Sequence, residues 1–219
     1  MRTPDAVLAE VFRLDAALQL SLRFNIAPTQ DVAVVRSTAN GRELSQQRWG
    51  FFPSWEKQPE RARPLINARD DGLTKKRSFF KSSFQKRRCL IPSDGFYEWK
   101  KIDKKTKHPY YVRLRDDRPF AYAGLWTSWN EIETCTIITT GANEIMEPLH
   151  DRMPVILQPN QLKAWLEPTT SPDELQKMTS TYPTGQMEAY PVSSLVNSPR
   201  NNCPECLEKQ DILTQEELF

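Results

Sequence analysis

The order of apolar and polar positions predicts a chain built from short strands and a few short helices. Near the amino end an apolar stripe repeats at helical spacing, at Val7, Leu8, Val11 and Phe12. Thr3 can cap this segment, and Pro4 and Asp5 favour the first turn of a helix. We therefore predict a helix over about residues 4–14.

Strands are predicted where β-branched and aromatic residues alternate with polar ones or form short apolar runs between turn signals. These segments are 31–36, 44–49, 95–101, 110–115, 120–126, 133–139 and 186–192. Further helices are predicted at about 143–148, 160–166 and 172–180, with Asn160 and Ser171 as caps of the last two. The fold class that follows is α+β, with a curled and mostly antiparallel sheet.

A single domain is the expected organisation. A chain of 219 residues with 38% hydrophobic content is long enough to bury one substantial core. We assign residues 1–196 to the folded domain and interpret residues 197–219 as a polar C-terminal tail. We expect the chain to be a monomer.

The charge of the chain is strongly asymmetric. Its net charge is +2, but residues 1–56 carry 0, residues 57–118 carry +11 and residues 119–219 carry −9. Aromatic residues are interleaved with the basic ones of the middle segment, a combination that single-stranded nucleic-acid sites use to bind phosphates and stack bases. Charge alone also allows a solvated basic region without a partner.

Composition argues against several other classes of protein. No run approaches the roughly 18 apolar residues of a membrane span, so we expect no membrane association and a cytoplasmic location. Cys89, Cys135, Cys203 and Cys206 are too few and too scattered for a disulfide framework. The last two form a C-x-x-C pair that is two ligands short of a closed zinc site. We interpret it as part of a loop and expect no metal and no cofactor.

One carboxylate stands out in the stretch from Cys89 to Trp99, where an apolar run meets a turn and then two aromatic residues. If this stretch ends in a strand, Glu98 shares a face with Phe96 and Lys100. A carboxyl group beside an aromatic ring loses hydration, which suits it to moving protons at neutral pH. The alternative is a solvated Glu98 paired with Lys100.

Two further segments carry polar side chains two positions apart. In an extended chain Asn67 and Arg69 point the same way, and so do His150 and Arg152. The second pair suits a site in which a phosphate is bound beside a reacting carbon. A capped histidine in a structural ion network is the alternative. Thr139 ends the preceding strand and can line the same cleft.

An aromatic loop is predicted at Trp49-Gly50-Phe51-Phe52-Pro53-Ser54-Trp55, because its glycine and proline exclude a regular helix. This loop either lies at the edge of a cleft or fills the core with its rings. A second turn-rich segment, Asn25-Ile26-Ala27-Pro28-Thr29-Gln30, leads into the strand predicted at residues 31–36.

Together these segments resemble the motifs of a known family, the SOS response-associated peptidase (SRAP) family of abasic-site processing proteins. The matching segments are Asn25 to Gln30, Trp49 to Trp55, Ile66-Asn67-Ala68-Arg69, Cys89 to Trp99 and His150-Asp151-Arg152-Met153-Pro154. The resemblance covers about residues 3–195. It implies one domain with a β-barrel-like core and peripheral helices, and a DNA-damage response and repair function at abasic sites in single-stranded DNA.

The resemblance also implies a reaction. In the family a cysteine after the initiator methionine becomes the N-terminal residue. Its amine and thiol capture the abasic aldehyde, first as an imine and then as a thiazolidine, which links the protein covalently to the DNA. Lyase-type chemistry at the abasic site is the alternative outcome. Asn67 would hold the nucleophile, Glu98 would move protons, and His150 would assist ring opening or crosslink reversal. Removal of the protein's own initiator methionine is the only proteolysis, and so the only peptidase activity, that we expect.

Residues for DNA binding are implied in the same way. They are Asn25, Pro28, Trp55, Arg69, Thr139 and Arg152. The two arginines would bind the phosphates that flank the lesion, whereas the tryptophan and the loop from Asn25 to Pro28 would wedge or stack against bases. The expected partner is single-stranded DNA with abasic sites, and the bound protein would be associated with the nucleoid.

The sequence departs from the family at its amino end. It begins Met1-Arg2-Thr3-Pro4, without the family's first strand and cysteine, and its four cysteines are internal. We expect an N-terminally shortened version of a protein that has this cysteine. The alternative is a natural variant that binds DNA without thiazolidine chemistry.

Two other functions are compatible with the residues. A non-catalytic single-strand binding module would use the basic segment and its aromatic residues, and would be indifferent to the lesion. A cysteine peptidase that acts on other proteins has little support, since no cysteine stands near a histidine in the sequence.

Overall fold

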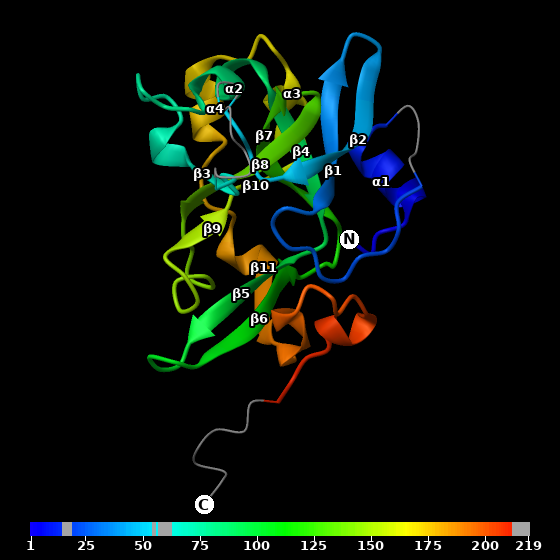
Figure 1. Ribbon diagram of the computed structural model, residues 1–219, viewed down its shortest axis with the longest axis vertical. Helices are drawn as coiled ribbons and strands as arrows, with labels where there is room; N and C mark the ends of the chain where they lie inside the picture. Colours follow the sequence, from blue (N-terminus) through cyan, green and yellow to red (C-terminus); the bar gives the residue numbers. More distant parts are fainter. Residues whose placement is uncertain (15–18, 54–55, 57–62, 212–219) are drawn as a thin grey trace, which may run out of the picture.

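A curled sheet organises the fold (Figure 1), and strand pairing closes five of its strands into a ring. The computed structural model describes residues 1–14, 19–53, 56 and 63–211. The ring strands are β1 (Asp31–Thr38), β2 (Gly41–Trp49), β4 (Arg88–Ser93), β7 (Phe120–Trp129) and β8 (Ile132–Gly141). Hydrogen bonds connect β7 to β4, β4 to β1, β1 to β2, β2 to β8 and β8 back to β7. Only the β2–β8 pair of this ring is parallel.

Three short strands extend the ring, and three others form a separate sheet. The short strands are β3 (Asn67–Arg69), β9 (Arg152–Pro154) and β10 (Ile156–Leu157). Strands β3 and β9 pair with β8, and β10 pairs with β7. The separate sheet consists of β5 (Phe96–Lys101), β6 (Lys107–Leu114) and β11 (Met187–Pro191), in the order β11-β6-β5. The predicted curled, mostly antiparallel sheet is confirmed.

Short helices lie at the periphery. The α-helices are α1 (Asp5–Phe12), α2 (Lys81–Lys86), α3 (Leu162–Leu166) and α4 (Pro172–Lys177). The 3-10 helices are η1 (Asp70–Gly72), η2 (Pro159–Gln161), η3 (Thr184–Gln186), η4 (Ser194–Asn197) and η5 (Pro204–Leu207). The cap predicted at Ser171 is confirmed, because its side chain accepts a hydrogen bond from the Glu174 backbone N–H. The cap predicted at Asn160 is wrong, since Gln158 caps η2 and Gln161 is the residue before α3.

The helix predicted at 143–148 is also wrong, because residues 144–149 form turns. The side chain of Asn143 accepts a hydrogen bond from the Met146 backbone N–H at 3.1 Å and donates one to the Tyr182 carbonyl oxygen at 2.9 Å. Pro148 has no N–H for the helical ladder, and the bond to Tyr182 fixes the start of this segment against a distant part of the chain.

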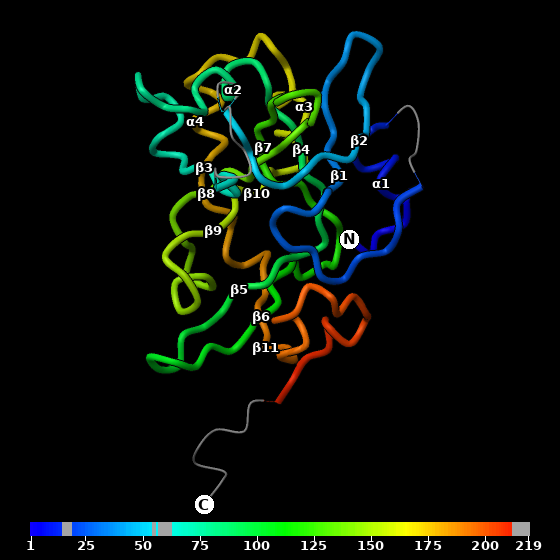
Figure 2. Tube along the Cα trace, in the orientation of Figure 1, coloured from blue at the N-terminus to red at the C-terminus, as the bar shows by residue number. Residues whose placement is uncertain are grey.

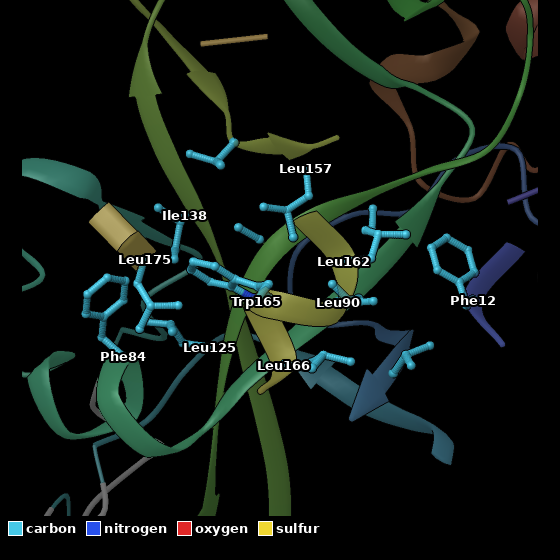
Figure 3. Close-up of a cluster of buried hydrophobic side chains, with 14 of the residues drawn as sticks. Phe12, Phe84, Leu90, Leu125, Ile138, Leu157, Leu162, Trp165, Leu166 and Leu175 are labelled. Atoms are coloured by element: carbon cyan, nitrogen blue, oxygen red, sulfur yellow. The ribbon is translucent and has the colours of Figure 1, made fainter. Parts of the chain in front are cut away.

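Trp165 of α3 lies at the centre of the largest apolar cluster (Figure 3). Its ring is fully buried, and its Nε1–H donates to the Cys89 carbonyl oxygen at 3.0 Å. Phe84 of α2 packs edge-on against it with ring centroids 6.0 Å apart. A buried tryptophan of this kind stabilises a fold by about 3–5 kcal/mol relative to alanine. The cluster thereby fixes the helices against the outside of the strand ring.

The segment that we interpreted as a polar tail is partly packed. Within its described residues, 197–211, Cys206 is fully buried in a cluster with Tyr111 and Val196. The Tyr97 hydroxyl lies 3.4 Å from the Cys206 carbonyl oxygen, and the Gln210 backbone N–H donates to Pro191 at 2.9 Å. A few apolar side chains of this segment cover the aromatic rings of β5 and β6, which a polar composition does not reveal.

Figure 2 marks the amino end of the chain within the outline of the molecule, and hydrogen bonds to Asp94 place it beside the turn between β4 and β5. It lies there because α1 packs Leu8 and Phe12 into the main core, where both are buried. The helices within the described residues are all too short or too polar to cross a membrane.

Candidate functional site

A cavity of about 460 Å³ lies between the strand ring and the three-stranded sheet. Its walls include most of the site residues predicted from the sequence, namely Asn25, Pro28, Asn67, Glu98, Thr139, His150 and Arg152. They come from the loop before β1 and from β3, β5, β8, β9 and the turn before β9. An amide, a carboxyl group and an imidazole from distant segments therefore share one cavity.

Asn67 is presented by the first position of β3. This strand lies parallel to β8, with Asn67 opposite Ile137. Ala68 is fully buried, so the alternation of the strand leaves Asn67 and Arg69 exposed on the other side. The Trp49 Nε1–H donates to the Ile66 carbonyl oxygen at 2.8 Å, which anchors the backbone just before the amide.

Glu98 lies in β5, opposite Tyr110 of β6, and is half-buried. Phe96 lines the cavity with it, and so do Tyr97 and Trp99 from the other face of the strand. One carboxylate oxygen, Oε1, accepts a hydrogen bond from the Trp99 backbone N–H at 3.2 Å. No ion pair with Lys100 is found among the described residues, which disfavours the alternative of a solvated, lysine-paired carboxylate.

His150 stands at the mouth of the cavity with half of its side chain (50%) exposed, so it is not a core histidine. Its Nδ1 atom lies 3.0 Å from the Arg152 backbone N and 2.9 Å from Asp151 Oδ1. A neutral Nδ1 accepts from the Arg152 N–H, whereas a protonated Nδ1 donates to Asp151. The Nδ1 atom of the imidazole therefore has a hydrogen-bond partner whether or not it carries a proton.

Arg152 is held by an acidic partner that the sequence did not suggest. Its Nη2 lies 2.6 Å from Asp70 Oδ1 and also donates to the Thr139 carbonyl oxygen. The same carboxyl group accepts a hydrogen bond from the Thr140 hydroxyl at 3.0 Å. The guanidinium is thus fixed beside the cavity, and its buried Nε–H has no acceptor among the described residues.

Three residues of the predicted DNA-binding set differ from the rest. Arg69 does not line the cavity; its Nε–H lies 3.2 Å from Asp71 Oδ1 on the surface. Asn25 lines the cavity, but its buried side chain donates to the carbonyl oxygens of Val196 and Ser198, both at 3.1 Å. Trp55 lies outside the described residues.

The aromatic loop combines both arrangements that the sequence allowed. Trp49 lines the cavity, whereas Phe51 is almost fully buried and packs edge-on against Phe80 with centroids 5.2 Å apart. The loop therefore borders the cavity with one ring and fills the core with another.

Sequence reasoning missed Asp94, a buried carboxylate on the cavity wall. The backbone N–H groups of Arg2 and Thr3 and the Thr3 hydroxyl donate to its oxygens, and the Met1 ammonium nitrogen lies 3.7 Å from Oδ2. An aspartate between Ser93 and Gly95 is typical of a turn. The only other sequence feature that marks Asp94 is its position directly after the apolar run that forms β4.

The Met1 amine is thereby brought to the cavity. Burial lowers the pKa of this amine below its ordinary value, and the nearby Asp94 carboxylate opposes part of that shift. A lower pKa leaves more of the amine neutral at pH 7, which is the form that attacks carbonyl carbons.

All four cysteines belong to the described residues, and none of them lines the cavity. Cys89 is fully buried, and burial raises the pKa of its thiol well above the ordinary value. Cys135 is buried as well, with its thiol pKa raised for the same reason. These two thiols are structural in character, since a nucleophilic cysteine needs an accessible thiolate.

Comparison with known proteins points to one family. The family model described as SOS response associated peptidase (SRAP) matches residues 1–199. Abasic site processing protein YoqW of Bacillus subtilis (strain 168) is 45% identical over 210 residues, covering 92% of this chain and 93% of its own length. Abasic site processing protein YoaM of the same organism is 44% identical, covering 86% and 85%. A crystal structure of a protein from Bacteroides thetaiotaomicron superimposes with a TM-score of 0.74 at 28% identity, covering 83% and 82%.

Proposed function

This chain belongs to the SOS response associated peptidase (SRAP) family, and we propose that it processes abasic sites in DNA within the cavity described above. The observation that carries this proposal is the convergence of Asn67, Glu98 and His150, which are far apart in the sequence, on the same cavity. Relatives named abasic site processing proteins support the same substrate class.

An abasic site in its ring-opened form carries an aldehyde. A neutral amine adds to this carbon to give a carbinolamine, which loses water to form an imine; a neighbouring thiol can then add to the imine carbon and close a thiazolidine ring. The aldehyde oxygen must gain protons as it leaves, and the attacking nitrogen must lose them. We propose that Glu98 moves these protons and that His150 assists ring opening and the reverse reaction.

The nucleophilic amine is proposed to lie at the Asp94 end of the cavity. Asp94 binds the backbone of the first residues of the sequence, so an N-terminal group in this region is directed at the cavity rather than at solvent. Asn67 lines the same cavity and would orient the group through its amide. The thiol of the thiazolidine would come from an N-terminal cysteine, because the cavity wall itself contains no cysteine.

Single-stranded DNA is the proposed form of the substrate. Arg152 and Thr139 would bind a phosphate beside the lesion, and Pro28 and Trp49 offer surfaces against which bases can stack. We also propose DNA contacts for Arg69, which does not line the cavity, and for Trp55, which lies outside the described residues. We propose a monomer that acts in the cytoplasm and at the nucleoid, with lyase-type chemistry. Peptidase activity would be limited to its own initiator methionine.

A crosslinking assay tests the proposal directly. Single-stranded DNA with one abasic site is incubated with the sequence as given and with a version extended to begin with Met-Cys-Gly-Arg, and adducts are separated on a denaturing gel after heating. The extended version should form a heat-stable adduct, and the sequence as given should not. Intact DNA of the same sequence is the control. If the extended version gives no adduct, the proposed chemistry is wrong.

A further inference from the structure

The β5–β6 hairpin projects from the body of the protein (Figure 1), and its sequence carries a dense positive charge. Between residues 100 and 108 the sequence has five lysines and one aspartate. Four of these lysines, Lys101, Lys104, Lys105 and Lys107, are exposed, and Lys100 is half-buried. Within the described part of the chain none of the five forms an ion pair.

Two of these lysines lie opposite basic or titratable side chains across the hairpin. Lys101 of β5 lies directly opposite Lys107 of β6, and Lys100 lies opposite His108. Like charges at directly opposed positions of an antiparallel pair repel each other and destabilise the hairpin. An anionic ligand between or beside these side chains would relieve the repulsion.

The one acidic side chain between residues 100 and 108, that of Asp103, does not neutralise the lysines. The Asp103 carboxylate accepts hydrogen bonds from the backbone N–H groups of Lys105 and Thr106, at 2.7 and 2.9 Å. These bonds close the turn and lower the pKa of Asp103, so the carboxylate stays charged while it holds the loop. Asp103 thus holds the backbone of the turn, and its carboxylate forms no ion pair with a lysine among the described residues.

The base of this hairpin is the wall of the cavity. Glu98 and Trp99 line the cavity, and Lys100 follows Glu98 on the same face of β5 at a distance of about 6.6 Å along the strand. From Glu98 to the turn the hairpin extends on the order of 16 Å, enough to follow several phosphates of one strand. A DNA strand that leaves the cavity along this face of β5 would meet Lys100 first, with Lys104 and Lys105 of the turn beyond it.

We propose that the β5–β6 hairpin binds the sugar–phosphate backbone of the DNA strand on one side of the lesion, an inference that rests on the proposed function of the cavity. Lysine ammonium groups bind phosphates as point charges, without reading bases. Apart from Ile102, which is 52% exposed, the hairpin tip offers no large apolar side chain for insertion into a base stack or a membrane. The contact is therefore independent of sequence and of the lesion.

Salt-dependent binding tests this assignment. Fluorescence anisotropy gives the affinity of the protein for intact single-stranded DNA between about 50 and 200 mM salt. In a variant with Lys101→Gln, Lys104→Gln and Lys105→Gln, the slope of log affinity against log salt should become shallower by about 2, at about 0.7 per lost phosphate contact. At the lowest salt the affinity should fall roughly tenfold or more.

Two further variants serve as controls. Replacing the same three lysines by arginine keeps the charge and should keep the salt slope. Replacing Lys163 and Lys177 by glutamine, both exposed on helices far from the cavity wall, should leave slope and affinity unchanged. The Tm of the hairpin variant should not fall, because a repulsive pair has been removed.

The side of the lesion is identified with abasic oligonucleotides that carry the site near one end or near the other. The glutamine variant should weaken binding of one of these oligonucleotides much more than the other. An unchanged salt slope, equal losses for both oligonucleotides, or hairpin-dependent binding to phosphatidylserine vesicles without an effect on DNA would overturn the proposal. A different result would refute the proposed function alone. In that case the extended version would form no crosslink, although DNA binding would still depend on the hairpin lysines.

Discussion

The guanidinium of Arg152 and the carboxylate of Asp70 lie 2.6 Å apart although 82 residues separate them in the sequence. Asp70 follows β3, and Arg152 begins β9; both strands pair with β8, and this shared neighbour brings them together. The contact connects the segment that carries Asn67 to the segment that carries His150. It therefore fixes two of the proposed catalytic side chains relative to each other.

Asp70→Asn should destabilise the fold and loosen this connection. The substitution removes a charge-assisted hydrogen bond between side chains that are only 20% and 18% exposed, which should lower the free energy of unfolding by about 1–3 kcal/mol. Urea unfolding measures the loss. Asp71→Asn is the matched control, because its pair with Arg69 is exposed and should contribute less than about 1 kcal/mol. Equal effects of the two substitutions would contradict the structural role of Asp70.

Glu98→Gln and His150→Ala should separate binding from chemistry. In the version that begins with Met-Cys, we expect slower crosslink formation for Glu98→Gln, by about 10²–10⁴-fold if it is a general acid–base group. His150→Ala should change ring opening or crosslink release. Both variants should bind intact single-stranded DNA with unchanged affinity, measured by anisotropy. A non-catalytic binding module predicts instead that neither substitution affects adduct formation or release.

Asn25→Ala should release the segment around residues 196–198. The Asn25 side chain satisfies the carbonyl oxygens of Val196 and Ser198, and its removal leaves partly buried acceptors without a partner at a cost of about 1–3 kcal/mol. Limited proteolysis should then cut the C-terminal segment faster than in the unsubstituted protein. Asn201→Ala offers a comparison, since its side chain donates to a single exposed carbonyl oxygen, that of Leu195. Equal cleavage rates in the two variants would argue against an anchoring role for Asn25.

Gly95→Ala should be poorly tolerated because the backbone of Gly95 lies against Tyr111. A Cβ atom at this position would lie 2.4 Å from the Tyr111 hydroxyl oxygen and 2.6 Å from the Val112 carbonyl oxygen. Overpacking of this kind typically costs about 1–3 kcal/mol, and here it would also displace Asp94 from the first residues of the sequence. Gly141→Ala is the control, because nothing lies within 4 Å of its added Cβ. Thermal unfolding of both variants checks the difference.

The thiol of Cys203 should react slowly with iodoacetamide at neutral pH. A hydrogen bond with the Glu205 carboxylate raises the pKa of this thiol to about 11, so the reactive thiolate is scarce at pH 8 and increases as the pH rises toward that value. The rate should therefore keep rising beyond pH 9. Glu205→Gln should lower the pKa and speed alkylation at pH 8. A rate that levels off below pH 9 in the unsubstituted protein would contradict this interaction. Mass spectrometry identifies the labelled cysteine.

Local patterns identified most of the elements. The apolar stripe of α1, the β-branched run of β1 and the cap at Ser171 depend on residues that are neighbours in the sequence, so a local pattern reveals them. The turns at residues 144–149 were missed, because the bond from Asn143 to Tyr182 joins segments that no local pattern connects. The packed residues after 197 were missed for the same reason.

What the sequence determined by itself was the chemistry available: one amide, one carboxylate, one imidazole and a basic middle segment, in the order that resembles a known family. Only the tertiary structure decided that Asn67, Glu98 and His150 share a cavity, that Arg69 does not line it, and that Asp94 holds the amino end beside it. Residue types and their spacing are local properties. Which of them meet depends on the strand pairings that close the ring, and those are set by packing over the whole chain.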